Sequence, residues 1–248
     1  WSTQFIANKT DGAEIHYDLS QMTIAFLDIE TECEKGFSNA ENVTERINAI
    51  TVRVKDQRWV FGLGEFTAPF KDVDNSLKTE CHSYTDEAEL LQDFVEMWAA
   101  LKPDIVSGWN VRFFDIPYLV NRIEEVLSER QAKRLSPWKQ IRTKVINKWG
   151  QNYTVYELLG ISTLDFYELF KKYTYQNQES WKLGHIAYVV LGEKKLSYEE
   201  YDHMATFYRE NFQKFVAYNV HDVDLVYRMD EKLNLIDLHV SLAYLAKI

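Results

Sequence analysis

The sequence predicts an α/β domain. Short runs rich in β-branched and aromatic residues, of strand length, are interspersed with longer segments whose apolar residues recur at helical spacing. Hydrophobic residues make up 46% of the 248 positions and aromatic residues 15%, which is enough to build a substantial core.

The first predicted strand is the one that bears on function. Residues 24–27 form a continuous apolar run, which is typical of a buried central strand. The run ends in Asp28-Ile29-Glu30, and residues two apart on a strand point to the same face. The two carboxylates repel each other unless a positive charge lies between them, and Mg²⁺ or Mn²⁺ would supply one with a preference for oxygen ligands. A surface Asp-x-Glu at a strand end is the alternative, and this motif alone does not decide.

Two strands follow a charged loop that carries a lone aromatic residue, Phe37. Residues 47–54 and 58–63 read as strands joined by a short turn, which predicts an antiparallel hairpin.

A helix comes next, with Thr85 as its cap, acidic residues in its first turn and Pro103 after its end. Residues 105–106 form a short strand that Gly108 ends. Asp115 then stands two residues before Pro117, where it suits an N-cap or the first turn of another helix.

The second half contains a hairpin and several helices. Residues 143–149 and 153–159 can pair across Gly150, within a stretch rich in basic and aromatic residues. A strand end at 163–165 is followed by a helix at 166–173 and by a second helix that Ser180 caps and that runs to Leu191. Ser197 and Glu200 match a capping box, and a long helix then runs over about 206–233. Tyr218 and Asp222 lie one turn apart on one face of the last helix. Such a pair is usually solvated surface or includes a core tyrosine with its hydrogen bond satisfied, and a role in a site is the alternative.

Composition narrows the class of protein. No apolar stretch approaches a membrane span, and the N-terminus lacks the pattern of a signal peptide. Two cysteines argue for a reducing cytoplasm, and the absence of an initiator Met predicts a fragment of a longer protein. The net charge of −10 counts against a nucleic-acid partner unless some of the acids hold metal ions.

Three motifs together resemble the exonuclease motifs of family B DNA polymerases, in the tyrosine-type branch of four-acid exonucleases. They are Asp28-Ile29-Glu30, Phe114-Asp115-Ile116-Pro117-Tyr118 and Tyr218-Asn219-Val220-His221-Asp222. The sequence is most similar to the replicative polymerases of T-even-like bacteriophages, from about residue 10 to the C-terminus. The resemblance implies a ribonuclease-H-like fold, a mixed sheet flanked by helices with an extra β-hairpin. It also implies 3′→5′ proofreading of single-stranded or frayed DNA.

The resemblance also implies a two-metal site for Mg²⁺ or Mn²⁺. Asp28 would bridge both ions, Glu30 and Asp222 would complete the site that activates water, and Asp115 would belong to the second ion. Tyr218 would hydrogen-bond the attacking water or a phosphate oxygen. We expect it to position that group and not to act as a base, because a phenol titrates near 10.

Four further residues are implied to contact DNA. Asn110 and Phe114 belong to the second motif, Phe37 would stack on a terminal base, and Lys195 would contact phosphate near the metals. Two alternatives stay open: Phe37 folds back onto the first hairpin, or Lys195 is an ordinary surface lysine.

We therefore expect an exonuclease domain at 21–233, between a lead-in segment at 1–20 and a segment at 234–248 that leads toward a missing palm. Asp222-Val223-Asp224 only superficially resembles a polymerase aspartate pair, so we expect no synthesis. The expected partners are the 3′ end of single-stranded DNA, the rest of the parent polymerase and, through it, a sliding clamp, in the host cytoplasm and without a membrane. An RNA-trimming exonuclease and a catalytically silent nucleic-acid-binding module are the alternatives.

Overall fold

The computed structural model describes residues 18–34, 39–68, 77–148, 150–175, 177–193 and 204–247. The strands are β1 (Ile24–Thr31), β2 (Ile47–Val54), β3 (Gln57–Gly62), β4 (Lys78–Ser83), β5 (Ile105–Ser107), β6 (Ile141–Lys148), β7 (Gln151–Leu158) and β8 (Ser162–Thr163). The α-helices are α2 (Glu87–Leu101), α3 (Asp115–Val126), α4 (Glu129–Ala132), α5 (Phe166–Tyr173), α6 (Leu183–Leu191), α7 (Met204–Glu210), α8 (Phe212–Leu233) and α9 (Leu235–Ala246). Two short 3₁₀ helices are η1 (Leu19–Gln21) and η2 (Lys133–Leu135).

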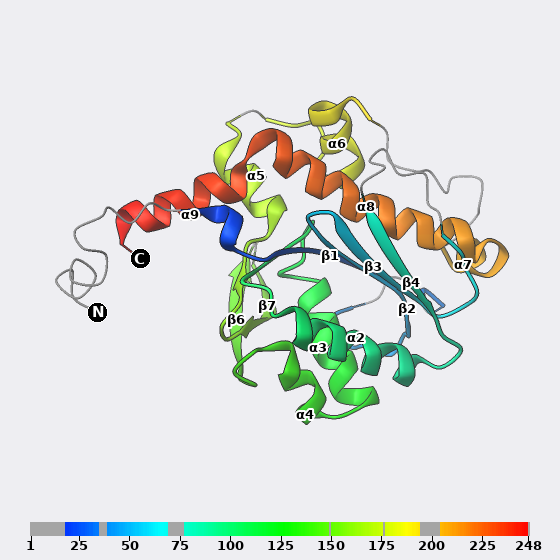
Figure 1. Cartoon of the computed structure of the whole chain (residues 1–248). Coiled ribbons are helices and arrows are strands. Elements are labelled where there is room, and N and C mark those ends of the chain that lie inside the picture. The colour runs from blue at the N-terminus through cyan, green and yellow to red at the C-terminus, as the bar shows by residue number, and fades with distance from the viewer. Residues whose placement is uncertain are drawn as a thin grey trace.

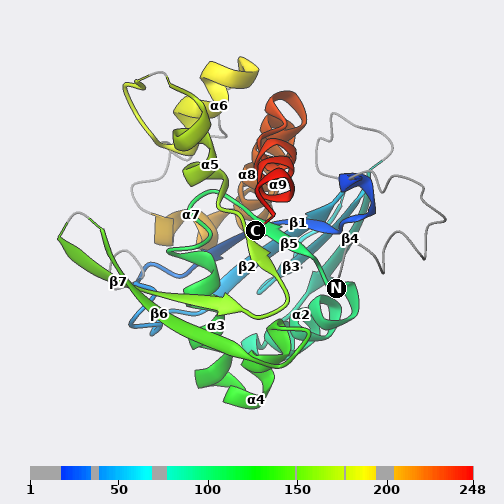
Figure 2. The same cartoon turned by 90° about the vertical axis from the view of Figure 1, so that its left-hand side faces the viewer.

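A mixed sheet with the strand order β4-β3-β2-β1-β5-β8 forms the centre of the fold (Figure 1). The strands β1, β2 and β3 are antiparallel neighbours, whereas β4, β5 and β8 each pair in parallel with the strand beside them. β6 and β7 form a separate antiparallel hairpin that projects beyond the main sheet (Figure 2). The predicted mixed α/β sheet with an extra hairpin, as in ribonuclease-H-like domains, is confirmed.

Helices cover both faces of this sheet. α2 and α3 lie against one face, with α4 packed on these two helices, and α8 crosses the other face over β1 and β2 (Figure 1). Alternate residues of β2 therefore enter different cores: Ile50 and Val52 pack with α2 and α3, and Ala49 packs with α7 and α8. Burial on both faces explains why seven of the eight residues of β2 are buried, including the polar Asn48, Thr51 and Arg53.

Buried charges hold α8 against the sheet. Asp224 of α8 accepts a hydrogen bond from Arg53 of β2 at 2.8 Å and another from Arg58 of β3 at 2.6 Å. The Arg53 guanidinium also lies 3.7 Å from the centre of the Tyr227 ring. The structure thus gives Asp224 a role in anchoring the helix that carries Asp222.

A second buried ion pair fixes the start of β2. Arg122 of α3 binds Glu87 of α2 through two hydrogen bonds of 2.9 and 2.6 Å. Glu87 also accepts the backbone N–H of Ile47, and Arg122 donates to the carbonyl of Val43, both at 2.8 Å. One pair therefore joins two helices to the segment that enters the sheet.

The predicted caps of two helices are wrong, one by one residue and the other by two. Asp86, not Thr85, caps α2, because its carboxylate accepts the N–H groups of Ala88 and Glu89. Ser180 does not begin a helix: its hydroxyl accepts the N–H of Lys182 in the preceding turn, and α6 begins at Leu183.

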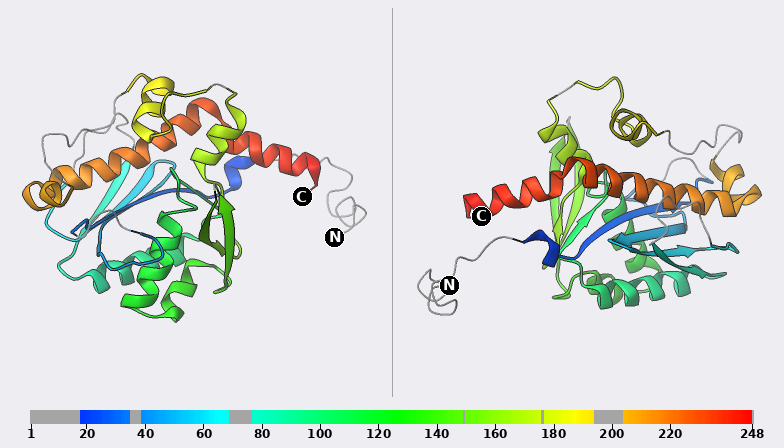
Figure 3. Two further views of the ribbon diagram at one scale, coloured as in Figure 1. Left: turned by 180° about the vertical axis from the view of Figure 1, so that it is seen from behind. Right: turned by 45° about the horizontal axis from the view of Figure 1, so that its top comes forward.

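The long predicted helix at 206–233 is two helices. Asn211 interrupts it with an extended φ of −146°, and its side chain accepts the N–H of Lys214 to cap α8. The sequence also gave no signal for β4, whose residues are half-buried or exposed at the sheet edge, or for α9. α9 continues from α8 past the sheet (Figure 3). Asp115 occupies the first turn of α3, one of its two predicted places.

Some predictions concern residues that the structure does not describe. Phe37, Lys195 and the capping box at Ser197 and Glu200 lie outside the described residues, as does most of the segment 1–20. Within the described part of the chain, no helix is both long enough and apolar enough to span a membrane.

Candidate active site

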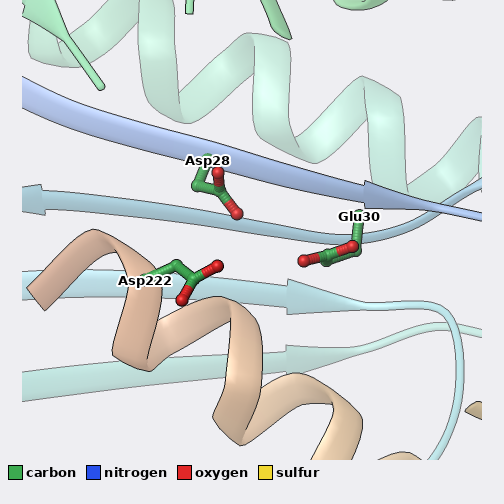
Figure 4. Close-up of side chains that lie close together, drawn as sticks. All are labelled: Asp28, Glu30 and Asp222. Carbon is green, nitrogen blue, oxygen red and sulfur yellow. The ribbon is translucent and has the colours of Figure 1, made fainter. Parts of the chain in front are cut away.

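Three carboxylates converge between β1 and α8. Asp28, Glu30 and Asp222 each offer one oxygen atom, and these oxygens lie within 4.8 Å of one another. Figure 4 shows the two side chains of β1 and the one of α8 directed toward a common space. Carboxylate oxygens are the ligands that Mg²⁺ and Mn²⁺ prefer, so this set of donors fits a divalent metal ion.

The strand geometry explains why these acids meet. Asp28 and Glu30 point toward α8, while Ile29 between them points to the opposite face and is buried in the core with α2 and α3. The pairing of β1 with β2 is irregular directly after Glu30, and such bulges often lie beside functional sites. Asp222 reaches the cluster because α8 packs across β1.

Asp115 lies next to this cluster but is not part of the group of three. Its carboxylate accepts the backbone N–H of Ile29 at 3.0 Å, and the side chain is buried. Burial raises the pKa of Asp115 to about 7, and the charges of Asp165 and Asp222 act in the same direction. A nearby cation would favour the ionised form of this carboxyl.

Asn219 links the cluster to β2. Its Nδ2 donates to Oδ2 of Asp28 at 2.7 Å, and its Oδ1 accepts from the Thr51 hydroxyl at 2.5 Å. Sequence analysis did not single out Asn219, although it lies inside the third motif beside Tyr218.

Asp165 supports the loop of the second motif, and it too was missed as a functional residue. It caps α5, and its carboxylate accepts the backbone N–H groups of Asn110, Arg112 and Tyr167 at 3.0–3.1 Å. These bonds hold Asn110 at a φ of +68°, which is uncommon for a residue other than glycine. Burial raises the pKa of Asp165 to about 6. Its position at a predicted strand end was the only signal in the sequence.

One cleft of about 1530 Å³ joins these residues. It is lined by seven of the nine predicted site residues, namely Asp28, Glu30, Asn110, Phe114, Asp115, Tyr218 and Asp222. The Tyr218 ring packs edge-on against Phe207, with the ring centres 6.1 Å apart, and 6% of the residue is exposed.

Aromatic and basic side chains line other parts of the cleft. They come from the second motif, the hairpin, α5 and the segment before α6, and they are Trp109, Phe113, Lys148, Tyr153, Tyr167, Trp181 and Lys182. The Lys148 ammonium lies 3.1 Å from Glu168 and 4.1 Å from the centre of the Phe113 ring. Aromatic rings beside cations are typical of surfaces that bind single-stranded nucleic acid.

Comparison with known proteins gives a consistent pattern. Residues 3–186 match the sequence profile of the family described as DNA polymerase family B, exonuclease domain. The chain is 33% identical to the DNA-directed DNA polymerase of Escherichia phage RB69 and 31% identical to that of Enterobacteria phage T4, in each case over 97% of its length. It is 31% identical to a DNA polymerase of guinea pig cytomegalovirus over 86% of its length. The chain spans only 29% of the length of each phage polymerase and 19% of the length of the cytomegalovirus polymerase.

Proposed function

This chain belongs to the exonuclease domain of family B DNA polymerases, and from that membership we propose that it hydrolyses the 3′-terminal nucleotide of single-stranded or frayed DNA. The observation that carries the proposal is the group of three carboxylates with oxygens within 4.8 Å of one another, in a cleft that also holds aromatic and basic groups. A solvated surface motif does not account for an Asp222 that is 4% exposed beside two other acids.

Asp28, Glu30 and Asp222 would hold divalent metal, with Asp115 as the further ligand at the same cleft. The chemistry that two such ions supply when bound is activation of water and stabilisation of negative charge on the leaving 3′-oxygen. The half-buried carboxylates contribute a local negative charge that attracts Mg²⁺ or Mn²⁺ into a partly water-excluded site.

The other residues of the cleft position the strand. Tyr218 lines the cleft together with the acids, and its hydroxyl orients the attacking water or a phosphate oxygen by a hydrogen bond. Asn110, whose backbone N–H donates to Asp165, contacts the DNA backbone, and Phe114, whose N–H donates to the Asn110 carbonyl, contacts the terminal nucleotide. Lys148 and Lys182 attract phosphates and so offset the net charge of −10 where the DNA enters.

The domain would act as the editing part of a longer DNA-directed DNA polymerase. Its span of 29% of the phage polymerases supports this proposal, as does the order of its motifs. In this setting residues 21–233 form the exonuclease domain. Its partners are the rest of the polymerase and, through it, a sliding clamp, and it works in the host cytoplasm.

A single assay tests the proposal. A 5′-labelled single-stranded DNA oligonucleotide is incubated with the protein, with and without Mg²⁺, beside an RNA oligonucleotide of the same sequence. We expect a Mg²⁺-dependent ladder from DNA. Degradation of RNA alone would instead support an RNA-trimming enzyme, and binding without hydrolysis would support a silent module.

Variants of the acids make the test specific. Asp115→Ala and Asp222→Ala are expected to abolish hydrolysis while circular dichroism stays unchanged. Removing one of several like charges is expected to preserve or raise the melting temperature without metal. A rate loss of less than about tenfold in either variant would contradict the metal assignment.

A further inference from the structure

A buried chain of two hydrogen bonds runs from β2 through α8 to β1. Asn219 is fully buried, and so is Thr51, whose hydroxyl donates to the Asn219 side-chain oxygen. The Asn219 amide nitrogen in turn donates to Oδ2 of Asp28. The chain therefore ends on an acid of the carboxylate cluster.

We propose that Asn219 is a positioning residue that sets the orientation of the Asp28 carboxylate for metal binding, and that Thr51 fixes the direction of the Asn219 amide. The inference rests on the proposed function, because it assigns the amide a purpose only if Asp28 holds metal. Nothing in the comparisons assigns a role to either residue.

The direction of the amide follows from its two neighbours. An ionised carboxylate can only accept hydrogen bonds, so the NH₂ group of Asn219 must face Asp28 and its oxygen must face Thr51. A hydroxyl can donate to that oxygen, so both bonds are made at once. A flipped amide would place two acceptors together at Asp28, and because Asn219 is fully buried its side chain could not turn to water instead, which is unfavourable.

The position of Asn219 on α8 adds a second constraint. Asn219 precedes Asp222 by three residues, so both lie on one face of one helix. The helix α8 therefore supplies Asp222 itself and, through Asn219, holds Asp28. It fixes the relative positions of these two carboxylates when no metal ion is bound to offset their repulsion. Hydrogen-bonding partners of metal ligands commonly have this effect on metal affinity.

The test measures Mn²⁺ binding to the full chain by isothermal titration calorimetry after treatment with EDTA and dialysis. Asn219→Ala is compared with Asn211→Ala, a matched substitution that removes the N-cap of the same helix at a distance from the acids. Thr51→Val removes the hydroxyl at nearly constant shape, and Thr51→Ser keeps it. Melting temperatures without metal are recorded for all four variants.

We expect Asn219→Ala to bind Mn²⁺ about 10- to 100-fold more weakly than the unchanged protein. Asn211→Ala should melt at a lower temperature yet keep its Mn²⁺ affinity. Thr51→Val should lose affinity to a smaller extent, and Thr51→Ser should stay within about twofold.

Two results would overturn the inference while leaving the proposed function intact. In the first, the unchanged protein cleaves DNA, and the variant Asn219→Ala melts at a lower temperature but has an affinity for Mn²⁺ within about twofold of that of the unchanged protein. The second is an equal affinity for Mn²⁺ in the variants Thr51→Val and Thr51→Ser. This result would remove the role of Thr51. If the unchanged protein binds Mn²⁺ with the expected dependence on Asn219 but does not cleave DNA, the proposed function fails and the inference holds. If it binds no Mn²⁺, both fail.

Discussion

Replacing Asp224 with alanine tests whether buried charges fix α8 on the sheet. Asp224 is the shared acceptor for Arg53 and Arg58, at 2.8 and 2.6 Å. The side chain of Arg58 has no exposure to solvent, and that of Arg53 has 6%. Asp224→Ala therefore leaves two positive charges close together in the interior without the carboxylate that lies between them.

The expected loss of stability is large because the arginines cannot reach water. Removing one partner of a buried ion pair costs about 3–5 kcal/mol. A domain is stabilised by only about 5–15 kcal/mol in total, so this one substitution would remove a large share. Arg58→Met should have a smaller effect, because Asp224 then still binds Arg53 and no unbalanced charge is buried.

Urea unfolding followed by tryptophan fluorescence measures these changes. Glu129→Ala is the matched control: Glu129 pairs with Lys133 at 2.7 Å, but their side chains are 66% and 44% exposed. An exposed pair of this kind contributes little to stability, because solvent screens it. If Asp224→Ala lowers the free energy of unfolding no more than Glu129→Ala does, the anchoring role of Asp224 is wrong.

Three further predictions concern the cleft and its support. Tyr218→Phe should slow the chemical step in single-turnover assays with little change in DNA affinity, and an unchanged rate would return Tyr218 to a packing role against Phe207. Phe37→Ala should weaken single-strand binding about tenfold, within what one lost base stack allows, with little change in melting temperature; a lower melting temperature with normal binding would place Phe37 in the core. Because the pKa of Asp165 is raised from 3.8 to about 6, the folded state binds its proton more tightly than the unfolded state does. The bound proton therefore stabilises the folded state below about pH 4, and this stabilisation is lost as the pH rises through about 6. The loss is at most about 3 kcal/mol, because the pKa is raised by roughly two. Asp165→Asn should flatten that part of the curve of unfolding free energy against pH, and an unchanged slope would contradict the shift.

The parts of the fold that the sequence predicted carry strong local signals. β1 begins with a continuous apolar run, β2 is rich in β-branched residues, and α2 has a regular apolar spacing. β4 carries no such signal, because it lies at the sheet edge and its parallel pairing with β3 depends on distant residues. The break at Asn211 depends on a side-chain cap that the helical spacing on either side conceals.

The site was predictable only to the extent that its chemistry follows short motifs. Strand alternation places Asp28 and Glu30 on one face without reference to the rest of the chain. The hydrogen bonds from Asn219 to Asp28 and from Asn110 to Asp165 join distant parts of the chain, and no local pattern specifies such pairs. Composition indicated that basic and aromatic residues were abundant near the hairpin, but not that some of them share a cleft with the acids.

The distance along the chain between Asp28 and Asn219 has a consequence for biosynthesis. These residues are 191 positions apart, and every strand of the sheet precedes α8. A chain emerging from the ribosome can therefore complete its sheet before Asp222 exists, and no three-carboxylate cluster can form until α8 docks. Contacts this distant in sequence also slow folding. Under the proposed function, divalent ions would therefore stabilise only the last stage of folding, and a chain stalled before α8 would lack the three-carboxylate cluster.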